Sequence, residues 1–141
     1  MTTIAYHEGI IAYDSRLTQG PYISQDNFNK QILRNGARFF FTGAPSDYET
    51  FIEVYTLANT QKATPNEALV VEKGKLFYCG INAEDGFFKE EWPLNVAIAI
   101  GSGGDHAITA IDCGHSARFA VKMAAKRDSR TGGRIRTYTI K

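Results

Sequence analysis

The chain opens with two short hydrophobic runs separated by two polar residues. Residues 2–6 and 9–13 are rich in β-branched and aromatic side chains, and His7-Glu8 lies between them. Runs of this kind around a short polar break predict a β-hairpin. Neither run alternates cleanly between apolar and polar residues, which is typical of strands covered on both faces. Turn-forming residues 14–21 then lead the chain away from the sheet.

The same type of pattern predicts further strands along the chain. They cover residues 30–33, 37–42, 67–71, 76–79, 86–90, 94–100 and 135–140. Asn35-Gly36 and Lys73-Gly74 supply two-residue hairpin turns, and Asn-Gly is a preferred pair at that place. Trp92-Pro93 breaks the pattern, because proline cannot donate to a strand ladder.

The hydrophobic period lengthens to that of a helix in three places. The first apolar stripe consists of Tyr48, Phe51, Ile52, Tyr55 and Ala58. Ser46 and Glu49 have the spacing of a capping box at its start. A second helix holds Ala107, Ile108 and Ile111; a third holds Ala117, Ala120, Val121 and Ala124. Gly114 and Ser116 are the expected stop and cap between these two. Strands, helix, strands, helices and a last strand favour an α+β fold over repeating βαβ units.

Composition narrows the class of protein. The 141 residues are 43% hydrophobic and 22% charged, as in an ordinary globular chain, so we expect a single domain over residues 1–141. A net charge of +1 gives no reason to expect nucleic acid or an anionic membrane as partner. No apolar run could span a bilayer and no signal peptide is evident, so we expect a cytoplasmic protein. Cys79 and Cys113 have no metal-type spacing and are expected to be reduced, packed thiols.

The first candidate for chemistry is Thr2. Threonine after Met1 is small enough for methionine aminopeptidase to expose it. Thr2 would then carry a hydroxyl and a free α-amine, and such an amine (pKa about 7.7–8.0) is a usable base near neutrality. The alternative is that Met-Thr-Thr is an ordinary protein start without catalytic meaning.

Other charged and glycine-rich positions are ambiguous by themselves. The turn at residues 101–104 lacks the residues of a phosphate-binding loop and fits a tight strand-to-helix connection. Asp14 and Lys30, taken singly, fit a solvated turn charge and a surface lysine. The basic residues near the C-terminal end fit an exposed strand face or an interface rim: Arg127, Arg130, Arg134 and Arg136.

Five blocks of sequence, taken together, resemble one family. They are TTIA at 2–5, AYDSR at 12–16, FTGAPSD at 41–47, AIGSGG at 99–104 and DSRTGG at 128–133. Lys30 lies sixteen residues after Asp14, the separation that the family uses for its catalytic lysine. The blocks occur in order over nearly the whole chain, which resembles proteasome β-type subunits and bacterial HslV-type subunits.

The resemblance implies an N-terminal nucleophile hydrolase fold: an α+β, four-layer αββα sandwich with two antiparallel sheets between helical layers. It implies a threonine-type endopeptidase without metal or organic cofactor. Thr2 would be the nucleophile, Lys30 would lie beside it, and Asp14 would pair with Lys30. The Gly43 N–H would hold the oxyanion.

Further roles follow from the same resemblance. Ser102, Asp128 and Thr131 would form the hydrogen-bonded shell around the Thr2 amine. The substrate-binding positions would be Leu17, Thr18, Phe28, Ile32, Phe41 and Pro45. Four of these side chains are the predicted lining of the pocket for the residue before the scissile bond: Leu17, Phe28, Ile32 and Phe41. Because all four are apolar, they predict a preference for an apolar residue there. The alternative is that they simply belong to the core.

The sequence also departs from the family. Between the helix that ends near Lys62 and the strand at Glu67, only residues 63–66 remain, where family members have a second long helix. Pro45 has no N–H for a substrate strand. We still expect a homo-oligomer, for which a closed ring is one form. An ATP-dependent unfoldase is a further candidate partner. The alternatives are an amidase or acyl transferase for small molecules and a non-catalytic assembly subunit, because fold does not fix function.

Overall fold

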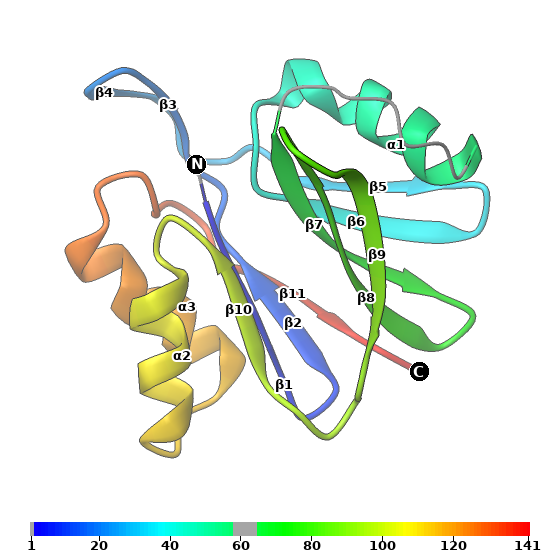
Figure 1. The fold of residues 1–141 in the computed structure, drawn as a ribbon. Helices are drawn as coiled ribbons and strands as arrows, with labels where there is room; N and C mark the ends of the chain where they lie inside the picture. Colours follow the sequence, from blue (N-terminus) through cyan, green and yellow to red (C-terminus); the bar gives the residue numbers. More distant parts are fainter. Residues whose placement is uncertain (1, 58–64) are drawn as a thin grey trace. The chain divides into compact units, whose positions relative to one another are not determined.

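A computed structural model describes residues 2–57 and 65–141 (Figure 1). These residues form two compact units. The first consists of Met1–Lys30 and Leu94–Lys141, and the second of Gln31–Pro93. The second unit is therefore an insertion in the sequence of the first. Each unit combines an antiparallel sheet with helix, which confirms the predicted α+β class.

The first unit is built on a four-stranded antiparallel sheet in the order β10-β1-β2-β11. Its strands are β1 (Thr3–His7), β2 (Ile10–Tyr13), β10 (Ile98–Gly101) and β11 (Arg136–Thr139). The predicted opening hairpin is confirmed, with Ile4 opposite Tyr13. Strands from the second half of the chain flank this hairpin on both sides, so the sheet joins the two ends of the sequence.

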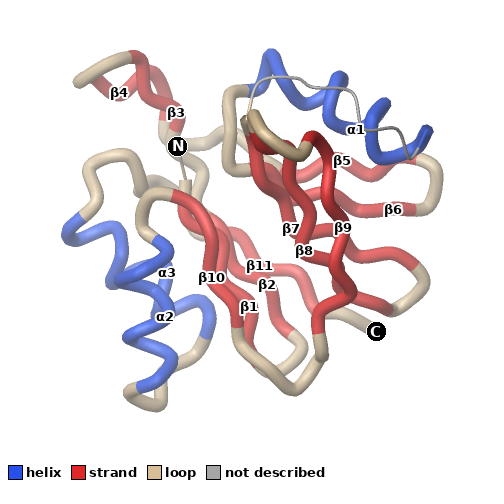
Figure 2. The backbone as a smooth tube through the Cα atoms, viewed as in Figure 1, coloured by secondary structure: helices blue, strands red, loops and turns tan. Residues whose placement is uncertain are grey.

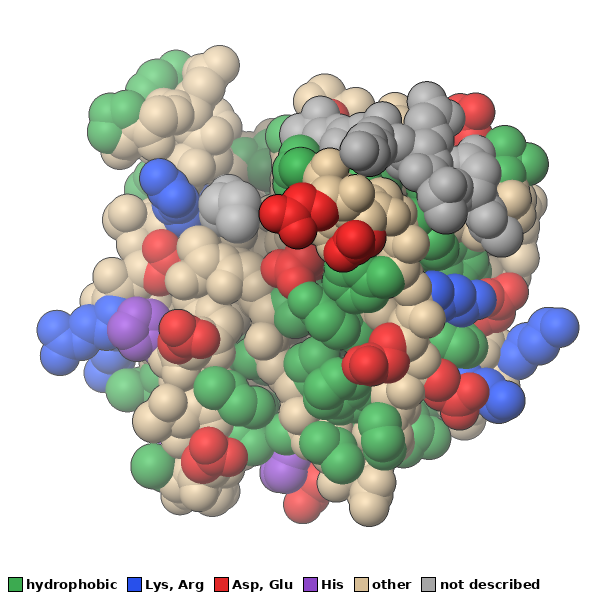
Figure 3. Space-filling model, viewed as in Figure 1, with side chains coloured by type: hydrophobic (Ala, Val, Ile, Leu, Met, Phe, Trp, Pro, Cys, Tyr) green, Lys and Arg blue, Asp and Glu red, His purple; other side chains and the backbone are tan. Residues whose placement is uncertain are grey.

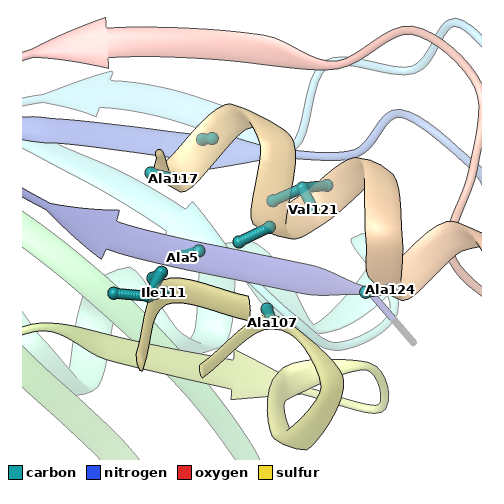
Figure 4. Packing of buried hydrophobic residues seen from close by; sticks show 8 residues of the cluster. Ala5, Ala107, Ile111, Ala117, Val121 and Ala124 are labelled. Atoms are coloured by element: carbon teal, nitrogen blue, oxygen red, sulfur yellow. The ribbon is translucent and has the colours of Figure 1, made fainter. Parts of the chain in front are cut away.

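Two helices pack on this sheet, α2 (Gly104–Asp112) and α3 (Ala117–Arg127), as Figures 1 and 4 show. The buried residues between them are mostly small: Ala5, Ala12, Ala107, Ile111, Ala117, Ala120, Val121 and Ala124. Alanine on both layers lets helix backbone approach the strands closely. The predicted helix ends are confirmed, because Ser116 Oγ accepts the N–H of Phe119 at 3.1 Å and Gly114 has a φ of +96°.

One hairpin of the first unit is absent from the prediction. Residues 14–21 were expected to form only turns, but β3 (Leu17–Gln19) pairs with β4 (Tyr22–Gln25). Gly20 makes the turn between them at a φ of +58°. All four residues of β4 are exposed, so no buried face marks this hairpin in the hydrophobic pattern.

The second unit is built on a five-stranded antiparallel meander, shown in red in Figure 2. Its strands are β5 (Gln31–Arg34), β6 (Ala37–Phe41), β7 (Asn66–Glu72), β8 (Lys75–Asn82) and β9 (Gly86–Trp92). Both predicted two-residue turns are confirmed. Asn35 and Gly36 have φ values of +55° and +80°, and Lys73 and Gly74 have +53° and +75°. Positive φ at both positions is what a type I′ hairpin turn requires.

Helix α1 (Tyr48–Leu57) packs on this sheet through aromatic side chains. Phe41 stacks on Tyr48 with 4.2 Å between ring centroids, and Phe51 meets Phe41 edge-on at 5.6 Å. Ala58, the last residue of the predicted stripe, lies outside the described residues, as do the expected helix end near Lys62 and residues 63–64 of the short connection.

The predicted capping box is wrong. Ser46 lies inside a 3-10 turn, η1 (Pro45–Asp47). The N-cap residue of this turn is Ala44, and no side-chain hydrogen bond caps it. Glu49 instead forms two hydrogen bonds of 2.9 Å with Arg34. A bidentate bond to a guanidinium is stronger than a single bond to a backbone N–H.

Four smaller findings complete the fold. Strand β10 begins at Ile98, because Leu94–Val96 form an exposed turn rather than the start of a strand. Cys79 is buried, as expected, but Cys113 is exposed, so it is not a packed thiol. Within the described residues, no helix is both long enough and apolar enough to cross a membrane. Acidic and basic side chains both occur on the face in Figure 3, in line with the small net charge.

Candidate active site

The β1–β2 hairpin brings Thr2 and Asp14 together. Thr2 immediately precedes β1 and Asp14 immediately follows β2. In an antiparallel pair, the residue before one strand lies near the residue after the other. The Asp14 N–H accordingly donates to the carbonyl of Thr3 at 3.3 Å, and the Thr3 N–H donates to Oδ1 of Asp14 at 3.2 Å.

Lys30 completes a buried group of three side chains. Its Nζ donates to Oδ1 of Asp14 at 2.9 Å and also to Oγ1 of Thr2. Thr2 Oγ1 in turn donates to the same carboxylate oxygen. Thr2 and Asp14 are fully buried and Lys30 is 2% exposed. A buried ammonium and a buried carboxylate need each other, since either alone would be a costly unpaired charge.

Burial lowers the pKa of Lys30, and the charge and hydrogen bond of Asp14 only partly oppose this effect. The ammonium is therefore a better proton donor than that of an exposed lysine. A cation at this place favours the deprotonated form of a neighbouring hydroxyl, here Thr2 Oγ1.

The second oxygen of Asp14 is held by backbone. Oδ2 accepts the N–H of Gly132 at 3.0 Å and the N–H of Arg16 at 3.3 Å. Ser15 adds a backbone bond to the carbonyl of Gly132 at 3.1 Å. The loop before β11 thus fixes the rotamer of Asp14, a contact that spacing along the sequence does not reveal.

A second polar group surrounds Asp128, at the end of α3. Its Oδ2 accepts hydrogen bonds from Ser102 Oγ at 2.5 Å and Thr131 Oγ1 at 2.6 Å. Burial raises the pKa of Asp128, but these two bonds and the N–H of Arg130 outweigh it and hold the pKa below its usual value. Ser102 Oγ also lies 3.5 Å from the carbonyl oxygen of Thr2.

Thr3 links the two groups and was not among the predicted residues. Its Oγ1 lies 2.7 Å from Oγ1 of Thr131. Because Thr131 donates its proton to Asp128, Thr3 is the donor in this bond. The only signal in the sequence was its place beside Thr2.

Two glycines of the 101–104 turn allow the close approach of the N-terminal segment. A Cβ on Gly101 would overlap the carbonyl oxygen of Thr2, and one on Gly103 would overlap Oγ1 of Thr3. Gly101 also has a φ of +96°. Glycine is therefore required here because the turn packs directly against Thr2 and Thr3. This requirement explains the glycines without phosphate binding.

The predicted catalytic residues of the first unit therefore lie together; they are Thr2, Asp14, Lys30, Ser102, Asp128 and Thr131. Gly43 lies in the second unit, where a Cβ on it would come within 2.5 Å of the Asn66 side chain. Among the residues that the structure describes, no cluster of His, Cys, Asp and Glu has the composition of a metal site.

The predicted substrate-binding residues are divided between the units. Leu17, Thr18 and Phe28 are half-buried in the first unit. In the second, Ile32 is half-buried and Pro45 is exposed. Phe41, also in the second unit, has no exposed surface and packs against α1. For Phe41, the alternative that it belongs to the core fits the structure better than a direct contact with substrate.

Comparison with known proteins supports the fold. No protein-family model and no curated protein matches the sequence. The structure is similar to that of Thiobacillus denitrificans BPH in complex with epoxomicin, with a TM-score of 0.69 and 16% sequence identity. The match covers 99% of this chain and 98% of that chain. At this identity the likeness concerns the fold alone, and it supports the fold that the sequence motifs predicted.

Proposed function

We propose that this protein is a threonine-type endopeptidase of the proteasome and HslV kind, with Thr2 as its nucleophile. The contact of the buried Lys30 ammonium with both Thr2 Oγ1 and Asp14 carries this proposal. A hydroxyl held between a cation and a carboxylate is an unusual arrangement unless its acidity matters. The shared fold with an epoxomicin-bound protein supports it further.

The mechanism starts with removal of Met1. Thr2 is fully buried in the unprocessed chain, and its nitrogen is an amide without basicity. After removal, the α-amine takes the proton of Oγ1 while Oγ1 attacks the scissile carbonyl. The protonated α-amine then gives this proton to the leaving nitrogen as the C–N bond breaks, which releases the amine product and leaves an acyl-enzyme. Water then hydrolyses the ester. Lys30 stabilises the developing alkoxide, and Asp14 keeps Lys30 charged and in place.

The other predicted residues complete the proposal. Ser102, Asp128 and Thr131 position the Thr2 amine, and the N–H of Gly43 holds the oxyanion. The role of Gly43 beside Thr2 requires the two sheets to stack in the αββα order. The similarity to BPH supports this part of the proposal. Leu17, Phe28 and Ile32 favour an apolar residue before the scissile bond.

We also propose that the enzyme works in the cytoplasm on polypeptides, as a homo-oligomer that encloses its sites. An unguarded peptidase would attack its surroundings. A docked ATP-dependent unfoldase would feed such a chamber. These points rest on the resemblance described above, and light scattering on the processed protein tests the oligomer directly.

Reaction with epoxomicin tests the proposal. This epoxyketone couples to a free amine and a hydroxyl of the same residue, so the processed chain gains the mass of one inhibitor on Thr2. Intact mass spectrometry reports Met1 removal and the adduct in a single measurement. We expect labelling of the processed chain and none of Thr2→Ala. A processed chain that stays unlabelled and hydrolyses no peptide would contradict the proposal.

A further inference from the structure

Basic side chains line an open cleft in the first unit, which reaches the candidate active site at Thr131 and Gly132. The cleft has a volume of about 980 Å³ and lies between α3 and the segment that leads into β11. Its lining contains five cationic residues and no Asp or Glu: Arg16, Arg118, Lys122, Arg134 and Arg136. The whole chain carries a net charge of only +1. The positive charge of the cleft therefore results from the way the fold places basic residues, not from an excess of them.

Among the residues that the structure describes, four of these five cationic side chains have no acidic partner. Arg16 is the exception, with Nε 2.8 Å from Oδ1 of Asp26. Arg136 bonds only to neutral groups, Ser15 Oγ at 3.2 Å and the side chain and carbonyl of Asn27 at 3.1 and 3.2 Å. Within the described part of the chain, Arg118, Lys122 and Arg134 form no ion pair and are exposed.

The fold brings these charges together from separate elements. Arg118 and Lys122 are one turn apart on α3, so their side chains share a face, where like charges repel. Arg134 and Arg136 flank Ile135 at the start of β11. Uncompensated charge of one sign inside a concave surface raises the local concentration of counter-ions.

We propose that this cleft binds an anion that carries several linked phosphate groups. Phosphate oxygens match the planar donor fork of arginine, and lysine serves as an additional point charge. One carboxylate or one phosphate would leave most of the four charges uncompensated, whereas a chain of phosphates neutralises them together. The cleft is also in the size range of small-molecule sites, about 300–1,000 Å³.

The linked phosphates can belong to either of two molecules, a free polyphosphate or the triphosphate of a nucleotide. Both molecules contain linked phosphate groups, and these are what the four cationic side chains would bind. This inference does not depend on the peptidase proposal, because none of the four belongs to the candidate catalytic residues.

Isothermal titration of the full chain at low salt tests the proposal, with inorganic tripolyphosphate, ATP, orthophosphate and a glutamate-rich peptide as probes. We expect saturable binding of tripolyphosphate, at least tenfold tighter than orthophosphate and weaker as salt rises. ATP that binds as tightly as tripolyphosphate identifies the triphosphate as sufficient. Much weaker ATP binding assigns the cleft to the free polyphosphate. Both results support the proposal.

Lys122 and Lys126 offer a matched pair of variants, because both are exposed lysines on α3 and only Lys122 lines the cleft. Lys122→Gln should weaken tripolyphosphate binding about tenfold or more, and Lys126→Gln by much less. Arg134→Gln provides a second test from another element. Equal losses in the two lysine variants, absence of saturable binding, or tighter binding of the acidic peptide would each overturn the proposal.

Discussion

Oδ2 of Asp14 accepts the backbone N–H of Gly132 at 3.0 Å, across 118 positions of sequence. This bond connects the end of the first hairpin with the loop before the last strand. It leaves Oδ1 of Asp14 to serve Lys30 and Thr2. The candidate site is thus fixed from both ends of the chain, and its parts are best tested one at a time.

The first prediction concerns the charge of Lys30. Lys30→Met keeps the length of the side chain but leaves Asp14 as a buried, uncompensated carboxylate. We expect kcat/KM for peptide hydrolysis to fall by about 10²–10³-fold, as when another stabilising donor is removed from an active site. Stability should fall by about 3–5 kcal/mol in urea unfolding.

Lys75→Met is the control, because Lys75 is an exposed lysine whose ion pair with Glu91 is 3.7 Å long. Loss of a surface pair should change stability by no more than about 1 kcal/mol and leave hydrolysis intact. Comparable activity in the two variants would remove Lys30 from the mechanism.

The second prediction concerns pH. The lowered pKa of Lys30, caused first by burial, means that its ammonium is lost below the ordinary value of 10.5. Activity that needs the ammonium is complete below the lowered pKa and falls as pH rises through it. The alkaline limb of kcat/KM should therefore lie below 10.5.

Lys30→Arg separates this effect from others, because a guanidinium stays charged throughout the measurable range. In that variant the remaining activity should lose its alkaline limb or shift it upward. An unchanged limb would assign the titration to another group.

The local pattern of the sequence predicted much of the fold. The turns at Asn35-Gly36 and Lys73-Gly74 and the Ser116 cap depend on neighbouring residues, so local rules find them. The β3–β4 hairpin was missed because it buries no face. Glu49 does not form the expected capping box, because it binds Arg34, a stronger hydrogen-bond partner that is distant in sequence.

The candidate site was predictable only in part. Asp14 and Lys30 look like surface charges when each is considered alone, and only the family resemblance grouped them. Thr3 and the Gly132 N–H were missed because their contacts depend on tertiary structure. For Phe41, spacing alone could not distinguish a place in the substrate pocket from burial under α1, where the structure leaves it no exposed surface.

The third prediction concerns Asp128. Its pKa is held below 3.8 by Ser102 and Thr131 despite opposing burial, so its ionised form stabilises the folded chain above that value. This contribution is lost as pH falls through the lowered pKa. Asp128→Asn should therefore be less stable than the parent near pH 6, and the difference should shrink on acidification. Urea unfolding at several pH values measures it.

Asp112→Asn is a suitable comparison, since Asp112 is exposed at the end of α2. It should lose little stability at any of these pH values. A constant difference between Asp128→Asn and the parent from pH 6 down to the acid transition would contradict the linkage.

The last prediction uses two glycines with the same backbone angle. Gly101 and Gly114 both have a φ of +96°, so alanine at either place pays a similar backbone strain, on the order of 1 kcal/mol. Their surroundings differ. A Cβ at Gly114 meets nothing within 4 Å, whereas a Cβ at Gly101 would overlap the carbonyl oxygen of Thr2.

Gly114→Ala should therefore lose stability and keep its rate of epoxomicin labelling. Gly101→Ala must push Thr2 away from Lys30 and Asp14, and a displacement near 1 Å costs about 10²-fold in rate. We expect labelling of Thr2 to slow by that factor in Gly101→Ala alone, measured by mass spectrometry on chains shown to lack Met1. If both variants react at the parent rate, the position of Thr2 against the 101–104 turn is irrelevant to its reactivity. In that case the proposed geometry of the nucleophile is wrong.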